Sequence, residues 1–391
     1  MTSDVRRLGS DALLSIFAFL FSVVIGLYVY RLLWGSLTSN EFSSWFLIFE
    51  ISQFLLLFDF GFTHKFILEC KDVNALGFKT KLNGLRFILL LAAVVASMAL
   101  LSVVVIYGRN AERLQSSYIF LSLSIIFTLL SYAETAALRV GFRNKSISII
   151  TIISQAIFIS ILFFLSDNMP FAIGVAVFSR SAFVYLSQIY VLGQGYEPKW
   201  VKGSYFGGGA VAINFSYFIL FMLDVAIFNM TVLDASDIAI LLVVKKYFDM
   251  LRALWDNVLP NMYARFARGG GGGVYIILTV FCFLSYIIAA FMAGWIIPVW
   301  ITGFAAGYSV YSAFCLSFFG VTLFRVVSLK MFYKEKLNWK FMVGIVVAIK
   351  SVFTIILIFG QAKVNAAYLA QGVLLITTMI TIDIKQSKGR N

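Results

Sequence analysis

The chain has 391 residues, of which 61% are hydrophobic and 13% are charged, and its formal net charge is +13. About 25% of the residues of a soluble protein are charged, and the mean hydropathy here is +0.94, so the composition excludes a set of water-soluble domains. With 41 Phe and only 4 Pro, the chain is not disordered either. The class that remains is a polytopic membrane protein.

Long apolar segments recur along the whole chain. A spanning helix needs about 20 mostly apolar residues, since each backbone polar group has to find its partner inside the segment. The segments are too long for strands and lack the alternation of a membrane barrel, so we predict an all-α fold with about twelve transmembrane helices. The predicted spans are 12–34, 43–64, 87–107, 117–138, 146–166, 171–192, 207–231, 238–263, 274–298, 303–328, 341–359 and 364–382.

The basic side chains gather at one set of helix ends. In the predicted loops, 21 Lys and Arg residues lie on one side and 3 on the other, while 7 lie inside spans. Basic loops face the cytoplasm, so we expect a multi-pass membrane protein with both termini there. The positive net charge is then an orientation signal, and no nucleic-acid partner is expected.

Polar breaks between spans predict two halves. The break at 193–206 carries Gly, Pro and charge and separates the first six spans from the last six. We therefore predict an N-terminal six-helix lobe over 1–192, a cytoplasmic linker over 193–206 and a C-terminal six-helix lobe over 207–391. Five glycines, Gly269–Gly273, follow the eighth span, and they are either a hinge or an ordinary flexible loop.

Metal and catalytic chemistry have little support in the sequence. The three cysteines form no CxxC pair, and His64 is the single histidine, placed at the end of the second predicted span. A His-based metal site needs more ligands than this, and a base at His64 has no evident nucleophile. We expect no catalytic residue, no metal and no cofactor.

Ionisable residues inside the predicted spans are the candidates for function. Charges at membrane depth are costly and usually face a polar interior or a partner. Cations of this kind are candidates for binding a substrate, and acids for ion pairs or for coupling. The candidate cations are Arg31, Arg180, Lys245, Lys246, Arg252 and Lys350, and the candidate acids are Glu50, Asp224, Asp249 and Asp256.

The eighth span has the most informative charge pattern. Its residues Lys245, Asp249, Arg252 and Asp256 are spaced 4, 3 and 4 apart, so they share one helix face and neighbouring turns can pair. These four residues either neutralise one another and hold helices together, or they line one wall of a hydrated cavity. Lys246 is expected to be an unmatched cation beside them.

Three other charges need partners from elsewhere in the chain. Arg180 and Lys350 have no opposite charge at i±3 or i±4 on their own helices. Each therefore requires another helix, water or an anionic ligand. For Asp224 we predict a pairing with Arg31, on the assumption that the first helices of the two halves meet.

Three segments resemble the polysaccharide transporter family. They are LLLFDFGFTHKFI (55–67), which places an Asp-Phe-Gly sequence at the end of the second span, RVGFRNKSISIITIISQ (139–155) and residues 223–266, in which the eighth helix ends with Leu259 and Pro260. On these motifs the chain resembles a Wzx-type O-antigen flippase of the multidrug/oligosaccharidyl-lipid/polysaccharide exporter superfamily. The resemblance implies two six-helix lobes around a central cavity that opens alternately to the two sides. It also implies a location in the bacterial inner membrane.

The same resemblance implies a substrate. It is an undecaprenyl-pyrophosphate-linked oligosaccharide, moved from the cytoplasmic to the periplasmic leaflet for O-antigen or other lipopolysaccharide or surface-polysaccharide biosynthesis. Implied partners are this lipid-linked oligosaccharide, membrane lipids and the polysaccharide polymerase with its chain-length machinery. The alternatives are a multidrug-type cation antiporter on the same fold and a membrane-embedded glycan-modifying enzyme. The cation antiporter would need acids to dominate its cavity, and the enzyme a large outer loop or a membrane-embedded His.

Overall fold

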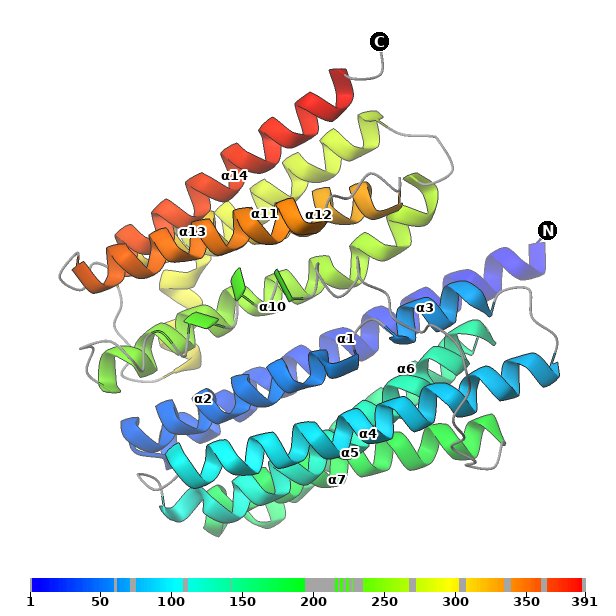
Figure 1. Cartoon of the computed structure of the whole chain (residues 1–391). Coiled ribbons are helices and arrows are strands. Elements are labelled where there is room, and N and C mark those ends of the chain that lie inside the picture. The colour runs from blue at the N-terminus through cyan, green and yellow to red at the C-terminus, as the bar shows by residue number, and fades with distance from the viewer. Residues whose placement is uncertain are drawn as a thin grey trace. The chain divides into compact units, whose positions relative to one another are not determined.

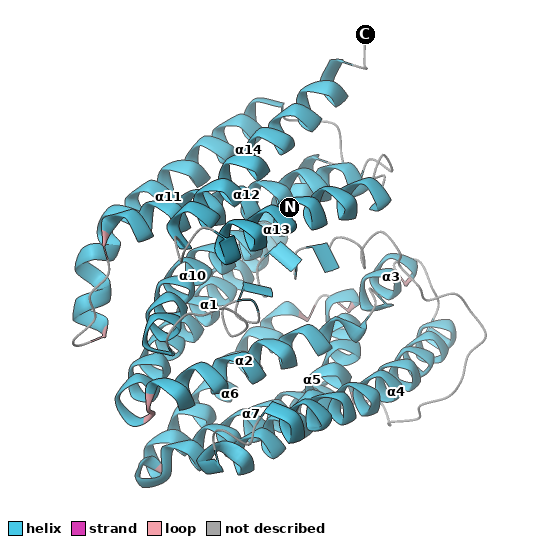
Figure 2. Cartoon of the chain, turned by 60° about the vertical axis from the view of Figure 1, so that its left-hand side comes forward, coloured by secondary structure: helices cyan, strands magenta, loops and turns pink. Residues whose placement is uncertain are grey.

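The protein is helical wherever the computed structural model describes it (Figure 1). Figure 2 shows α-helices and short turns, with no strand among the described residues. The described residues are 2–59, 62–70, 75–107, 112–141, 143–193, 215–216, 219–220, 223–224, 227, 235–266, 272–301, 307–333, 339–359 and 364–388. The predicted all-α class is confirmed.

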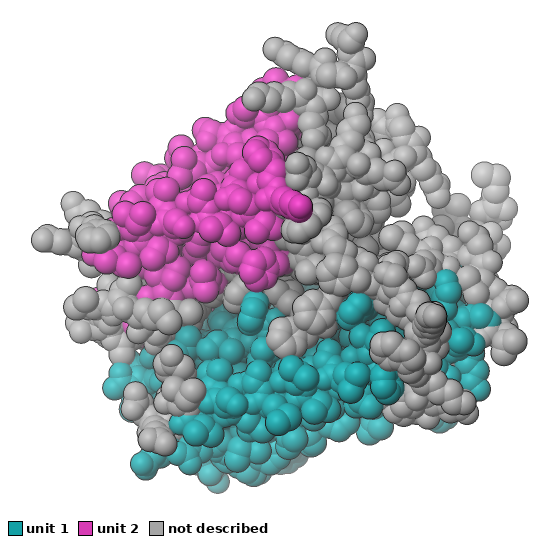
Figure 3. Space-filling model, in the orientation of Figure 1, with its two compact units in different colours: residues 1–211 teal, residues 212–391 magenta. Residues whose placement is uncertain are grey.

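The chain divides into two compact units, residues 1–211 and 212–391 (Figure 3). The predicted linker 193–206 lies outside the described residues except for Gly193, which ends a helix in the left-handed conformation with φ of 62°. Residues 269–271 of the glycine run lie outside them as well. Each unit is described below by itself.

Unit 1 is a bundle in which α5 lies between α4 and α7, and α6 packs against α7 and α1. Helix α2 is followed by a short 3-10 turn, η1, at Leu56–Asp59. The helices are α1 (Thr2–Ser36), α2 (Ser39–Leu55), α3 (Phe62–Glu69), α4 (Ala75–Tyr107), α5 (Gln115–Val140), α6 (Asn144–Phe164) and α7 (Met169–Leu192).

Unit 2 is built around α12, which packs against α10, α11 and α14, while α13 packs against α14. Helical residues at 215–216, 219–220, 223–224 and 227 lie in the predicted seventh span. The helices are α10 (Ala235–Phe266), α11 (Gly272–Trp300), α12 (Tyr308–Tyr333), α13 (Trp339–Phe359) and α14 (Val364–Lys388).

Nine helices in the described part of the chain are long and apolar enough to cross a membrane. Large apolar side chains such as Phe163 (73% exposed) and Phe291 (70% exposed) point away from the bundles, as a helix surface in contact with lipid requires. Of the twelve predicted spans, α2 has only 17 residues and α10 is rich in charge. The predicted span 207–231 is mostly outside the described residues.

The predicted second span, 43–64, is wrong at its end. Helix α2 stops at Leu55, and the chain passes through η1 into the separate helix α3. Asp59 makes this break favourable, because its carboxylate accepts hydrogen bonds from the Thr63 backbone N–H at 3.1 Å and the Thr63 hydroxyl at 2.6 Å. A carboxylate at a helix start satisfies backbone donors that have no partner inside the helix.

The predicted third span, 87–107, is also wrong at its start. Helix α4 begins at Ala75 and continues without a break to Tyr107. The residues Lys79, Lys81 and Arg86, which were expected in a cytoplasmic loop, are therefore helical. Arg86 is fully buried, and the ion pair that it forms is described below.

The close approach of α12 and α14 depends on a glycine. A Cβ atom on Gly372 would lie 2.6 Å from the carbonyl carbon of Leu316 and 2.7 Å from the backbone nitrogen of Ser317. We expect Gly372→Ala to lower the free energy of unfolding by about 1–3 kcal/mol, because the two backbones have to separate. Unfolding in micelles with a rising fraction of sodium dodecyl sulfate, followed by tryptophan fluorescence, measures this change.

Gly344 on α13 provides the matched control, because a Cβ atom there would meet nothing within 4 Å. We expect Gly344→Ala to leave stability unchanged or to raise it slightly, since Ala has the higher helix propensity. Equal effects of the two substitutions would contradict the steric explanation.

Candidate functional site

The charged turns of α10 form a compact cluster of Lys245, Lys246, Asp249 and Arg252. The Arg252 Nε donates to Asp249 Oδ1 at 2.8 Å, and its Nη2 bonds the same oxygen. The Lys246 Nζ lies 3.6 Å from Asp249 Oδ2. The predicted pairing between neighbouring turns is confirmed, whereas Lys246 is not the unmatched cation that was expected.

Three cations of α10 lie around one described carboxylate. Lys245, Lys246 and Arg252 each interact electrostatically with Asp249. The side chains of Arg252 and Lys246 remain 12% and 27% exposed, while Lys245 is buried. The side chain of Asp256 lies outside the described part of α10, so its predicted role is still a prediction.

Two side chains hold α10 against α11. The Trp255 indole N–H donates to Ser285 Oγ at 3.1 Å, and the Tyr247 hydroxyl donates to the Ala289 carbonyl at 3.0 Å. Tyr247 lies within the charged turns and Trp255 one turn after them, so the two bonds restrict the rotation of this part of α10. The charge cluster is therefore held at a fixed orientation relative to α11.

Arg180 lies near the middle of α7 and is partly exposed. Its guanidinium carbon is 5.9 Å from the centre of the Phe158 ring on α6, a distance at which a cation is attracted to the ring face. The next residue, Ser181, bonds Thr128 of α5 at 3.2 Å and so fixes the rotation of α7. Among the described residues Arg180 makes no ion pair, which leaves its donors available to an anion.

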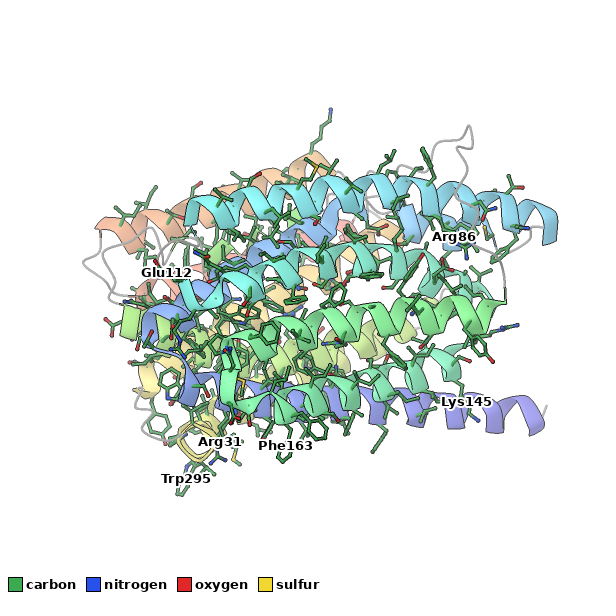
Figure 4. The ribbon with its side chains drawn as sticks, turned by 90° about the horizontal axis from the view of Figure 1, so that it is seen from below. Arg31, Arg86, Glu112, Lys145, Phe163 and Trp295 are labelled. Atoms are coloured by element: carbon green, nitrogen blue, oxygen red, sulfur yellow. The ribbon has the colours of Figure 1, made fainter. Side chains whose placement is uncertain are left out.

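Arg31 and Glu50 lie on α1 and α2 of the same unit. Arg31 is exposed and Glu50 is half-buried. Figure 4 shows Arg31 towards the end of unit 1 that also carries Phe163 and Glu112, away from Arg86 and Lys145.

Asp224 and Lys350 form a buried ion pair inside unit 2. The Tyr368 hydroxyl donates to Asp224 Oδ2 at 2.7 Å, and the Lys350 ammonium donates to Gln371 Oε1 at 3.0 Å. The same ammonium lies 3.9 Å from the centre of the Phe353 ring. Both carboxylate oxygens of Asp224 therefore have partners inside unit 2, and its pairing with Arg31 of unit 1 stays a prediction.

This ion pair changes the interpretation of Lys350. Its side chain is 3% exposed, so a ligand would first have to displace Asp224. A buried charge that loses its partner is strongly unfavourable. Lys350 therefore lies in an internal network that joins α13 and α14 to the segment around residue 224, and not on an accessible surface.

One buried charge was missed by the sequence analysis. Arg86 on α4 binds Glu134 on α5 through two parallel hydrogen bonds of 2.7 and 2.8 Å, and Asn83 accepts a third bond from Arg86 at 3.2 Å. Both ion-pair side chains are at most 1% exposed. The available signal was loop length, since an unstructured connection over 65–86 is longer than is usual between packed helices.

Comparison with known proteins supports the fold. No protein-family model and no curated protein matches the chain. A solved structure, described as the inward-facing conformation of a multidrug resistance MATE family transporter of the MOP superfamily, matches with a TM-score of 0.62 and 11% sequence identity. The match covers 93% of this chain and 92% of that one. The chain therefore shares the fold of that structure over almost its whole length.

Proposed function

We propose that this protein is a flippase that moves a lipid-linked oligosaccharide across the membrane by alternating access. The observation that carries the proposal is Arg180, a cation near the middle of α7 that makes no ion pair among the described residues. The α10 cluster adds Lys245, Lys246 and Arg252 around Asp249. Charges at this depth usually belong to a substrate path, and the guanidinium of Arg180 fits an anionic substrate.

The pairing of the acids also favours a negatively charged substrate. Glu134, Asp224 and Asp249 are each bound by a cation of the chain. A transporter of cationic drugs needs carboxylates that are able to exchange a partner for the drug, and these three would have to give up an ion pair first. The charge pattern therefore favours an anionic substrate over the multidrug-type alternative.

A pyrophosphate-linked lipid fits the accessible groups. Arg180 presents a planar guanidinium with no ion pair among the described residues, and such a group binds phosphate oxygens through two parallel hydrogen bonds. Arg252 and Lys246 add positive charge beside Asp249. We propose undecaprenyl pyrophosphate as the lipid and an inner-membrane location with both termini in the cytoplasm, in agreement with the loop charges. The polysaccharide polymerase and its chain-length machinery would then act on the product.

The test is surface glycan display in a bacterial strain that lacks its own flippase but keeps the matching glycan-synthesis genes. Expression of the chain is expected to restore surface polymer and to lower the amount of lipid-linked repeat units held in the inner membrane. Correct membrane insertion without either change, combined with new resistance to cationic drugs, would favour the multidrug-type alternative.

Arg252→Lys tests whether planar contact at α10 matters. We expect a fall in transport of about tenfold, because Lys keeps the charge but makes no bidentate contact. Initial rates of glycan appearance, normalised to the amount of inserted protein, measure the effect. Lys340→Gln, which removes an exposed cation at the start of α13, should leave the rate unchanged. A wild-type rate in Arg252→Lys would exclude a bidentate role.

A further inference from the structure

The turn between α5 and α6 carries three exposed cations within seven residues, Arg139, Arg143 and Lys145. Arg139 lies in the last turn of α5, Arg143 directly precedes α6, and Lys145 is in the first turn of α6. In the part of the chain that the structure describes, none of the three forms an ion pair with a carboxylate. Figure 4 shows Lys145 at the same end of unit 1 as Arg86.

Backbone hydrogen bonds give this turn a defined shape. The Gly141 N–H donates to the Ala137 carbonyl at 3.0 Å, and the Arg143 N–H donates to the Leu138 carbonyl at 2.9 Å. The Arg143 Nη1 donates to the Val191 carbonyl near the end of α7 at 2.6 Å. One nitrogen of its guanidinium is therefore fixed in place, and its remaining donors keep a constant direction.

Positive charges at the start of α6 are unusual for that position in a helix. Acidic residues or a polar cap are favoured there, since the first N–H groups carry partial positive charge. Helix α6 has no acid in its first turn and no side-chain cap, and Arg143 and Lys145 lie on either side of its first residue, Asn144. The positive-inside rule explains the presence of cations on this side, but it does not require a guanidinium fixed to α7.

An exposed apolar face continues from the cations along α6. Lys145, Ile149 and Ile153 follow at intervals of four residues, and the two isoleucines are 40% and 44% exposed. Tyr190 on α7, next to Val191, is 87% exposed. A phosphate bound at the turn would therefore have an apolar surface beside it, and that surface leads away from the cations along the helix.

We propose that this turn binds the phosphate of an anionic membrane phospholipid, with an acyl chain along Ile149 and Ile153. Arg139, Arg143 and Lys145 supply the charge-assisted hydrogen bonds, and Arg143 is held in position by Val191. The occupant is a lipid and not a soluble phosphate, because the apolar face continues directly from the cations. The site lies outside the charges assigned to transport, so the proposal does not depend on the transported substrate.

The experiment measures lipid retention by the purified full chain. Protein in micelles containing equal amounts of phosphatidylglycerol and phosphatidylcholine is examined by native mass spectrometry. The wild type is expected to retain phosphatidylglycerol preferentially. Arg143→Lys, which keeps the charge and therefore the insertion signal, should weaken retention about tenfold, as the loss of one bidentate contact predicts.

Two further variants complete the design. The triple substitution Arg139→Gln, Arg143→Gln and Lys145→Gln should remove the preference, while Lys340→Gln at an exposed position of unit 2 should keep it. The elution volume and tryptophan fluorescence of each variant show whether it is folded. A fourth variant, Ile149→Asn, should also weaken lipid retention, because it shortens the apolar face. If the triple variant does not fold, Arg143→Lys and Ile149→Asn test the site in its place.

Soluble competitors separate the two sources of phosphate. Glycerol 3-phosphate and inorganic phosphate at millimolar concentration should not displace the bound lipid, because neither has an acyl chain. Displacement by either one would overturn the lipid assignment. Wild-type retention by both Arg143→Lys and Ile149→Asn, or no preference in the wild type, would overturn the site itself.

Discussion

Arg86→Met is expected to lower the free energy of unfolding of unit 1 by about 3–5 kcal/mol, the usual cost of leaving one member of a buried ion pair alone. Arg86 and Glu134 are at most 1% exposed and share two short hydrogen bonds between α4 and α5. Without Arg86, the Glu134 carboxylate would have to be buried without its charge partner or take up a proton. Unfolding in mixed micelles of rising dodecyl sulfate content measures the loss.

Two controls separate the buried ion pair from charge removal in general. The double variant Arg86→Met, Glu134→Leu should recover most of the stability, because apolar side chains of similar volume replace the pair without a stranded charge. Arg113→Met breaks an ion pair with Glu41 in which Arg113 is 61% exposed, and it should cost less than about 1 kcal/mol. If the loss of unfolding free energy in the double variant equalled the sum of the losses from the two single substitutions, the explanation by a buried charge without a partner would be contradicted.

Arg180→Ala is expected to reduce transport at least tenfold without reducing the amount of inserted protein. Its guanidinium lies near the Phe158 ring and pairs with no carboxylate among the described residues, so its removal leaves none of these acids without a partner. A charge-assisted contact with phosphate contributes about 1.5–3 kcal/mol, and each 1.4 kcal/mol corresponds to about tenfold in affinity. Surface glycan and inner-membrane lipid-linked units, each normalised to inserted protein, are the measured quantities.

Lys350→Met is the matched control for a charge at membrane depth. Since Lys350 binds Asp224 and Gln371 in the interior of unit 2, its loss should lower the amount of folded protein. Arg180→Lys should transport at an intermediate rate, because it keeps the charge but not the fork of donors. Wild-type transport by Arg180→Ala at equal protein levels would remove Arg180 from the substrate path.

Local relations were predictable because they depend on helix geometry alone. The pairing of Asp249 with Arg252 follows from 3.6 residues per turn, which brings residues three apart onto one face, and the structure contains it. The break after Leu55 was located only approximately from the Asp-Phe-Gly sequence. The sequence shows Asp59, but it does not show that its carboxylate accepts two hydrogen bonds from Thr63 and so starts a new helix.

The sequence by itself determined the class of protein, since 61% hydrophobic residues in long runs leave no alternative to membrane-spanning helices. Only the tertiary structure decided which charges neutralise one another across helices. Lys350 and Asp224 are 126 residues apart, and Arg86 and Glu134 are 48 apart. A helix that is apolar on every side gives no sign of which face meets which neighbour. Such pairings therefore emerge only from the packing of the helices, and this packing separates internal ion pairs from cations that remain able to bind a ligand.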